Sequence, residues 1–94
     1  MSYDLIFEAA KKLSEVEIRL TSAAVKDYAI ALGGEFLFSG EAFTGNATRL
    51  GTMVFLDEPW KDDNMEIFKS MFSLLRLYQV ELYDPQLSRP IDTS

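Results

Sequence analysis

The sequence predicts an α+β domain in which two helices cover one face of an antiparallel sheet. Three observations predict it. Apolar and charged residues alternate over residues 15–20, which is typical of a half-buried strand. Aromatic and branched residues fill 35–43 and 48–56 on either side of a short turn that contains glycine and asparagine, which indicates a β-hairpin. Apolar residues at helical spacing over 65–77 are followed by alternation over 78–83, which indicates a helix and a last strand.

The N-terminal segment, residues 3–13, is ambiguous. Tyr3, Leu5 and Phe7 alternate with acidic residues, as in a strand, while other apolar residues of the segment stand at helical spacing. Good helix formers follow in the Ala-Ala-Lys-Lys stretch, and they favour a helix for the second half of the segment. We therefore expect an extra N-terminal helix, with an edge strand as the alternative.

The first of the two predicted helices follows the strand at 15–20. Thr21 or Ser22 offers an N-cap oxygen, and Val25 to Leu32 have helical spacing. Gly33-Gly34 is predicted to end this helix because glycine tolerates the left-handed conformation at a C-terminus.

The second helix is predicted to begin near Met65. Asp63 and Glu66 have the spacing of a capping box, and the buried stripe is predicted to be Phe68, Met71, Phe72 and Leu75. Pro85 is predicted to end the last strand.

From residue 15 onward the predicted order is strand, helix, hairpin, helix, strand. This order is the split β-α-β unit (βαββαβ) of ferredoxin-like folds, with the N-terminal segment as an extra helix or edge strand. Alternatively, Tyr3–Phe7 pairs with 15–20 and the sheet has five strands. The 94 residues are predicted to form a single domain, 1–94, with a loose C-terminal tail at 88–94.

One face of such a sheet is not covered by the helices. The alternation of the hairpin predicts Leu37, Met53 and Phe55 on this open face, where a patch of apolar side chains usually meets a partner. Another copy of the chain, the N-terminal segment and a foreign protein are the three candidates, so a homodimer through the open sheet face is one expectation.

Composition excludes several chemistries. The chain has no cysteine and no histidine, which excludes disulfides, thiolate nucleophiles, zinc–thiolate sites and imidazole bases. We expect no catalytic residues, no cofactor and no metal. Nine basic residues against fifteen acidic ones give a net charge of −6, so nucleic acid and anionic membranes are poor partners and a basic protein is a good one. The start of the chain lacks the pattern of a signal peptide and no apolar run is long enough to span a membrane, so we expect a cytoplasmic protein.

The densest charge lies between Asp57 and Glu66. The candidate partner-binding residues are Asp57, Glu58, Trp60, Asp62 and Asp63, with Glu41 nearby if the hairpin lies on the same side. Their spacing does not match a calcium loop. The acids near the helix start can instead complement the helix dipole, and Trp60 either anchors a partner or folds over the edge of the core.

The two ends of the chain resemble those of small bacterial immunity proteins of the toxin–immunity (contact-dependent inhibition) type. The resemblance rests on Met1-Ser2-Tyr3-Asp4-Leu5-Ile6-Phe7 and on Leu82-Tyr83-Asp84-Pro85-Gln86, about twelve of the 94 positions. It implies a protein that blocks one toxin, it implies no catalytic residues, and it implies a strand at Tyr3–Phe7.

The expected function is therefore that of a non-catalytic, protein-binding inhibitor of a toxin, with a basic nuclease as the favoured target. Two other functions compete with it: a phage-encoded inhibitor of a host defence complex, and a dimeric ferredoxin-like regulatory domain that binds a small ligand.

Overall fold

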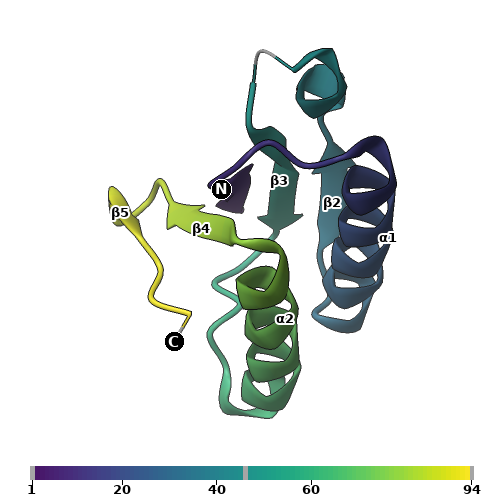
Figure 1. The fold of residues 1–94 in the computed structure, drawn as a ribbon. Coiled ribbons are helices and arrows are strands. Elements are labelled where there is room, and N and C mark those ends of the chain that lie inside the picture. Colours follow the sequence, from purple (N-terminus) through teal and green to yellow (C-terminus); the bar gives the residue numbers. More distant parts are fainter. Residues whose placement is uncertain (1, 46, 94) are drawn as a thin grey trace.

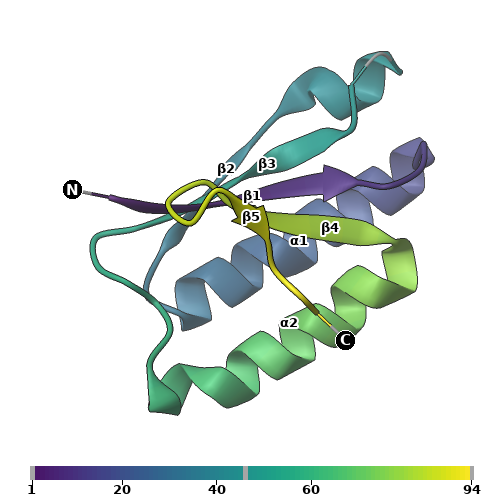
Figure 2. The ribbon, with the colours of Figure 1, turned by 90° about the vertical axis from the view of Figure 1, so that its left-hand side faces the viewer.

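The computed structural model describes residues 2–45 and 47–93. Two helices lie on the same side of a five-stranded antiparallel sheet (Figure 2), so the chain has an α+β fold. In chain order the elements are β1 (Tyr3–Ala9), α1 (Glu15–Ala31), β2 (Glu35–Phe38), the 3₁₀ helix η1 (Gly40–Thr44), β3 (Arg49–Phe55), the 3₁₀ helix η2 (Asp62–Asn64), α2 (Met65–Tyr78), β4 (Val80–Asp84) and β5 (Arg89–Pro90).

The strand order in the sheet is β2-β3-β1-β4-β5, and every neighbouring pair is antiparallel. The N-terminal strand β1 therefore lies in the middle of the sheet, and β2 and β5 form its two edges (Figure 1). Side chains from the covered face and from both helices form one core.

The prediction of a helix for the second half of the N-terminal segment was wrong. Leu5, Phe7 and Ala9 alternate as buried residues of β1, and the strand is hydrogen-bonded on both sides. Just beyond it, the Ala10 amide donates to the Gln79 carbonyl at 2.8 Å. Burial between two strands outweighs the helical propensity of the Ala-Ala-Lys-Lys stretch, because propensities amount to less than about 1 kcal/mol per residue.

The prediction of a strand over residues 15–20 was also wrong, and with it the alternative pairing of Tyr3–Phe7 with that segment. These residues form the first turns of α1, in which Ile18 is buried while Val16 and Leu20 are exposed. Ser14 caps the helix: its Oγ accepts from the Glu17 amide at 3.2 Å, and the Glu17 carboxylate accepts from the Ser14 amide at 3.0 Å.

The two N-cap positions proposed for this helix fall inside it instead. Thr21 is buried in α1, and its hydroxyl donates to the Glu17 carbonyl at 2.7 Å. The helix ends where the sequence predicted, since Gly33 has a left-handed φ of 82° directly after Leu32.

The pairing of the two aromatic runs is confirmed, but the turn between them is longer than predicted. β2 pairs with β3 from Glu35↔Val54 to Phe38↔Gly51, and η1 occupies half of the connection. Gly45 has a left-handed φ of 76°, and Asn46 of the predicted turn lies outside the described residues.

The assignment of Met53 and Phe55 to the open face of the sheet was wrong. Both are buried on the face that the helices cover, because Met53 pairs with Phe36, which packs against the core from the same face. Leu37 does lie on the open face, where its cross-strand neighbour is Thr52.

The second helix is confirmed at Met65–Tyr78, but the predicted capping box at Asp63 and Glu66 is not formed. Asn64 holds the N-cap position and its side chain makes no capping hydrogen bond. The last predicted strand begins two residues later than expected, at Val80, because Gln79 ends α2 in a left-handed conformation with φ 57°.

The end of the chain runs along the sheet edge on the α2 side. Arg89–Pro90 forms β5 against β4, the Ile91 amide donates to the Leu82 carbonyl at 2.7 Å, and the Arg76 guanidinium donates to the Thr93 carbonyl. Neither α1 nor α2, the two α-helices of the described residues, is long and apolar enough to cross a membrane.

Candidate functional site

The acidic loop, defined here as residues 56–63, connects β3 to α2. Its carboxylates Asp57, Glu58, Asp62 and Asp63 are all exposed, and none of the ion pairs among residues 2–45 and 47–93 involves them. Lys61 is the one basic residue of this loop. The structure therefore brings these four predicted binding residues together at one end of the sheet, as an acidic surface whose charge other residues do not neutralise.

Trp60 holds this loop against the body of the protein. Its ring stacks on Phe68 of α2 at a centroid distance of 4.4 Å and an interplanar angle of 28°. The indole Nε1 donates to the Tyr3 hydroxyl at 2.9 Å, and the side chain is half-buried. Of the two interpretations of Trp60, the structure therefore supports an aromatic side chain folded over the edge of the core.

Hydrogen bonds within the segment fix the path of the acidic loop further. The Pro59 carbonyl, in a buried residue, accepts from the Lys61 amide at 2.8 Å and from the Asn64 side-chain amide at 3.0 Å. The Asn64 backbone amide donates to the Lys61 carbonyl at 2.9 Å. A loop held in this way loses little conformational entropy when a partner binds.

Leu56 is the residue of this surface that the sequence analysis missed. It is 87% exposed, the highest value among the large hydrophobic residues of the described chain. A cavity of about 260 Å³ beside it is lined by Leu32 and Gly33 from the end of α1 and by Asp57, Glu58 and Pro59 from the loop. Leu56 ends the predicted run 48–56, two residues after Val54 and directly before the acidic residues, and an apolar residue at that position could have signalled an exposed side chain.

Glu41 does not belong to this surface. It lies in η1, which precedes β3, whereas the acidic loop follows β3. The two segments therefore stand at opposite ends of the sheet, as Figure 1 shows, and Glu41 cannot join Asp57 and Glu58 in one contact.

A buried network ties the start of the chain to its end. Asp84 is fully buried, and one carboxylate oxygen accepts from the Tyr3 hydroxyl while the other accepts from the Gln86 side-chain amide at 2.7 Å and the Leu87 amide at 3.2 Å. The Gln86 side chain also bonds to the Asp4 backbone: its Oε1 accepts from the Asp4 amide at 2.8 Å, and its Nε2 donates to the Asp4 carbonyl at 2.7 Å. The residues that carry the resemblance to immunity proteins thus hold β1 and β4 together.

The pKa values of this network follow from its contacts. Burial raises the pKa of the Asp84 carboxyl, but the hydrogen bonds that it accepts from Tyr3, Gln86 and Leu87 outweigh burial, so the pKa lies below its usual value. Burial, together with the bond donated to Asp84, raises the pKa of the Tyr3 hydroxyl above its usual value. Both shifts favour the state in which Tyr3 is neutral and Asp84 is charged, and we assign this pair a structural role.

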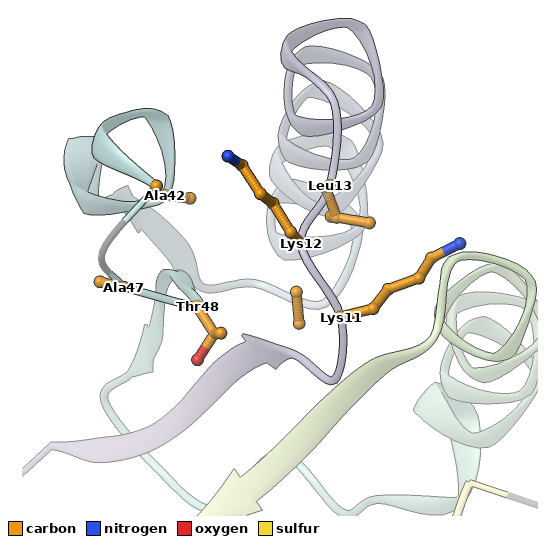
Figure 3. A pocket seen from close by; sticks show the side chains of 8 residues that line it. Lys11, Lys12, Leu13, Ala42, Ala47 and Thr48 are labelled. Carbon is orange, nitrogen blue, oxygen red and sulfur yellow. The ribbon is translucent and has the colours of Figure 1, made fainter.

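A smaller cavity at the other end of the sheet has two lysines among its lining residues. It measures about 130 Å³ and is lined by Ala9, Lys11, Lys12, Leu13, Ala42, Gly45, Ala47 and Thr48. In Figure 3 the Lys12 side chain extends toward η1, whereas Lys11 extends to the other side, toward α2. The two ammonium groups do not converge, so the cavity lacks the focused charge that an anion site needs.

In the part of the chain that the structure describes, no group of three or more carboxylates is placed to hold a metal ion. Comparisons of the chain with protein-family models, with curated proteins and with solved structures find no match in any of the three. The site must therefore be interpreted from its own geometry, which combines a rigid loop, unneutralised carboxylates and one protruding apolar side chain.

Proposed function

We propose that this protein is a non-catalytic inhibitor that binds a basic protein through the acidic loop. The observation that carries the proposal is the position of Leu56, which is 87% exposed beside Asp57 and Glu58. The loop that carries these residues is fixed by the stacking of Trp60 on Phe68. An exposed apolar side chain with carboxylates around it is suited to a partner that offers an apolar pocket rimmed by Lys and Arg.

Each part of the loop has its own role in this proposal. The four carboxylates attract the partner and speed association, because complementary charge acts mainly on the association rate. Leu56 enters a pocket of the partner and slows dissociation. Trp60 touches no partner and acts as a positioning residue, since its ring is stacked on Phe68 and its Nε1 bonds to Tyr3.

Within this proposal the partner is a bacterial toxin and the protein is its immunity protein, acting in the cytoplasm. The resemblance of the two chain ends to immunity proteins supports this, as does the net charge of −6. A nuclease toxin must carry basic residues to bind phosphates, so an acidic inhibitor fits it. We further infer a ferredoxin-like fold with β5 added at one edge, on the support of the element order β1-α1-β2-β3-α2-β4 and the strand order β2-β3-β1-β4.

The test uses three tagged baits in lysate of the native host. The first is the unchanged chain. The second carries Asp57→Lys and Glu58→Lys, which reverse the charge beside Leu56 without touching the first turn of α2. The third carries Asp27→Lys and Glu81→Lys, which make the same change in net charge at exposed positions outside the loop.

We expect one basic protein to be retained by the first and third baits and lost from the second. With that protein purified, Leu56→Ala should raise the dissociation rate while leaving the unfolding curve of the chain unchanged, because the side chain is exposed. Equal retention on all three baits, or retention of no basic protein by the unchanged chain, would contradict the proposal.

A further inference from the structure

The two edges of the sheet differ in how well they are protected against adding another strand. β5 has two residues, Arg89 and Pro90, and proline has no N–H to offer a neighbouring strand. β2 has four, and its run Phe36-Leu37-Phe38 carries no charge and no proline. Leu37 is 52% exposed and Phe38 is 47% exposed on this edge. Natural sheets usually block such edges with charges, proline or bulges, so β2 is an open pairing site.

The backbone of β2 shows which peptide groups are free for pairing. The Ser39 amide donates to the Leu50 carbonyl at 2.8 Å, and the same register pairs Leu37 with Thr52. In an antiparallel ladder the hydrogen-bonding residues alternate along each strand. The peptide groups of Leu37 therefore point toward β3, and those of Phe36 and Phe38 point outward, away from the sheet.

We propose that β2 pairs antiparallel with β2 of a second copy of this chain, about a two-fold axis at Leu37. This register places Phe36 of each copy opposite Phe38 of the other, so that the two outward-pointing residues exchange their hydrogen bonds. Leu37 falls opposite Leu37 of the second copy, in a non-hydrogen-bonded pair. Aromatic and aliphatic cross-strand pairs of this kind stabilise a ladder, and the interface is self-complementary as two-fold symmetry requires.

The charge of β2 also favours this antiparallel register over a parallel one in register, which would place Glu35 of one copy opposite Glu35 of the other. The one charged residue of β2, Glu35, falls opposite the neutral Ser39 of the second copy. Antiparallel pairing further sets the Glu35 end of each strand beside the end of the second copy's strand that lies near Arg19, whose guanidinium is paired with Glu15 at 2.9 Å and lies 5.3 Å from the Phe43 ring. That ring lies 5.7 Å from Phe38. Within β2 itself, therefore, no two like charges stand directly opposite one another.

The proposal does not depend on the function of the acidic loop, and it makes a different prediction for salt. Two chains that each carry a charge of −6 repel one another at a distance, and salt screens this repulsion. We therefore expect the dimer to strengthen as ionic strength rises, whereas binding of a basic protein to the acidic loop weakens.

Sedimentation equilibrium over a range of concentrations tests the proposal on the full chain. We expect a monomer–dimer equilibrium that Leu37→Lys shifts to monomer, because it places two ammonium groups directly opposite one another while each remains exposed in the monomer. Leu77→Lys is the matched control, since Leu77 lies on α2 and is 74% exposed. It should leave the dimer in place.

The absence of cysteine from the chain allows the register to be tested by cross-linking. In a non-hydrogen-bonded antiparallel pair the Cα atoms lie about 4.5 Å apart, which is within the range of a disulfide. Leu37→Cys should therefore form a disulfide-linked dimer under mild oxidation, much faster than Leu77→Cys.

Three outcomes would overturn the proposal: a monomer at every concentration, loss of the dimer with both lysine variants alike, or equal cross-linking of the two cysteine variants. A strand captured from another protein at this edge, with no self-association, would also count against a second copy.

Discussion

Trp60 in the acidic loop and Tyr3 in the first strand are joined by a 2.9 Å hydrogen bond from the indole Nε1 to the phenol oxygen. The same hydroxyl donates to the buried Asp84, so three segments far apart in sequence meet at one oxygen atom. The proposed binding loop is thereby connected to the central strand of the sheet and to the end of β4. Changes at this point should affect both stability and binding.

The first prediction separates the two contacts of Trp60. Trp60→Phe keeps an aromatic ring on Phe68 but removes the bond to Tyr3, and it should cost about 1 kcal/mol of unfolding free energy. Trp60→Ala also removes the stacked ring from a half-buried site, and it should cost about 2–4 kcal/mol. Urea unfolding followed by circular dichroism measures both values.

Binding provides the second readout for these two variants. We expect Trp60→Ala to weaken the capture of the basic partner, because the loop that carries Leu56 loses its support, while Trp60→Phe keeps most of it. If Trp60→Ala unfolded more easily but captured the partner as well as the unchanged chain, Trp60 would not position the loop.

The second prediction concerns pH. The pKa of Asp84 is lowered in the folded protein, so its contribution to stability is present above the unfolded value of about 4 and is lost as pH falls below it through the folded pKa. The pKa of Tyr3 is raised, so its contribution is present below about pH 10 and is lost as pH rises through the folded value. Stability should therefore fall at both ends of the pH range.

Asp84→Asn tests the acid side of this prediction. The amide keeps the shape of the side chain but removes the charge, so the free energy of unfolding should fall less between pH 7 and pH 3 than in the unchanged chain. Asp57→Asn makes the same change at an exposed carboxyl of the acidic loop and serves as the control. Parallel acid dependence in Asp84→Asn and the unchanged chain would show that the Asp84 carboxylate does not contribute to it.

The third prediction compares the N-caps of the two helices. Ser14→Ala removes the hydroxyl that caps α1 by accepting from the Glu17 amide, but it keeps the backbone amide that donates to the Glu17 carboxylate, and it should cost about 0.5–2 kcal/mol. Asp63→Ala at the start of α2 should cost only a few tenths of a kcal/mol, because no capping box forms there. What this variant loses is the interaction of one exposed carboxylate with the helix dipole, which is weak at the surface. A loss at Asp63 as large as that at Ser14 would mean that the predicted capping box forms in solution. Thermal unfolding of the two variants, compared with the unchanged chain, measures the difference.

The sequence predicted the elements whose pattern is local. The stripe of α2, in which Phe72 is only partly buried, the glycine stop of α1 and the pairing of β2 with β3 were found from spacing alone, because each depends on residues a few positions apart. The acidic loop was also found in this way, since its carboxylates are adjacent in the chain.

The local pattern was misleading in two segments. Residues 15–20 alternate as a strand does, yet Ser14 and Glu17 form a capping box and only Ile18 of the alternating apolar residues is buried. The reverse error was made at residues 3–13, where helical spacing and propensity competed with a strand. In both segments the choice between helix and strand depends on which other parts of the chain pack against the residues, and local sequence spacing does not contain that information.

The sequence by itself determined the α+β class, the excess of carboxylates and the exclusion of thiol and imidazole chemistry, because these follow from composition and short-range periodicity. Only the tertiary structure decided that β1 is central, that Trp60 faces Phe68 and Tyr3, that Leu56 protrudes, and that β2 is an unprotected edge. Each of these depends on contacts between segments far apart in the chain. Such contacts are set by the burial of one shared core, and no window of neighbouring residues contains that information.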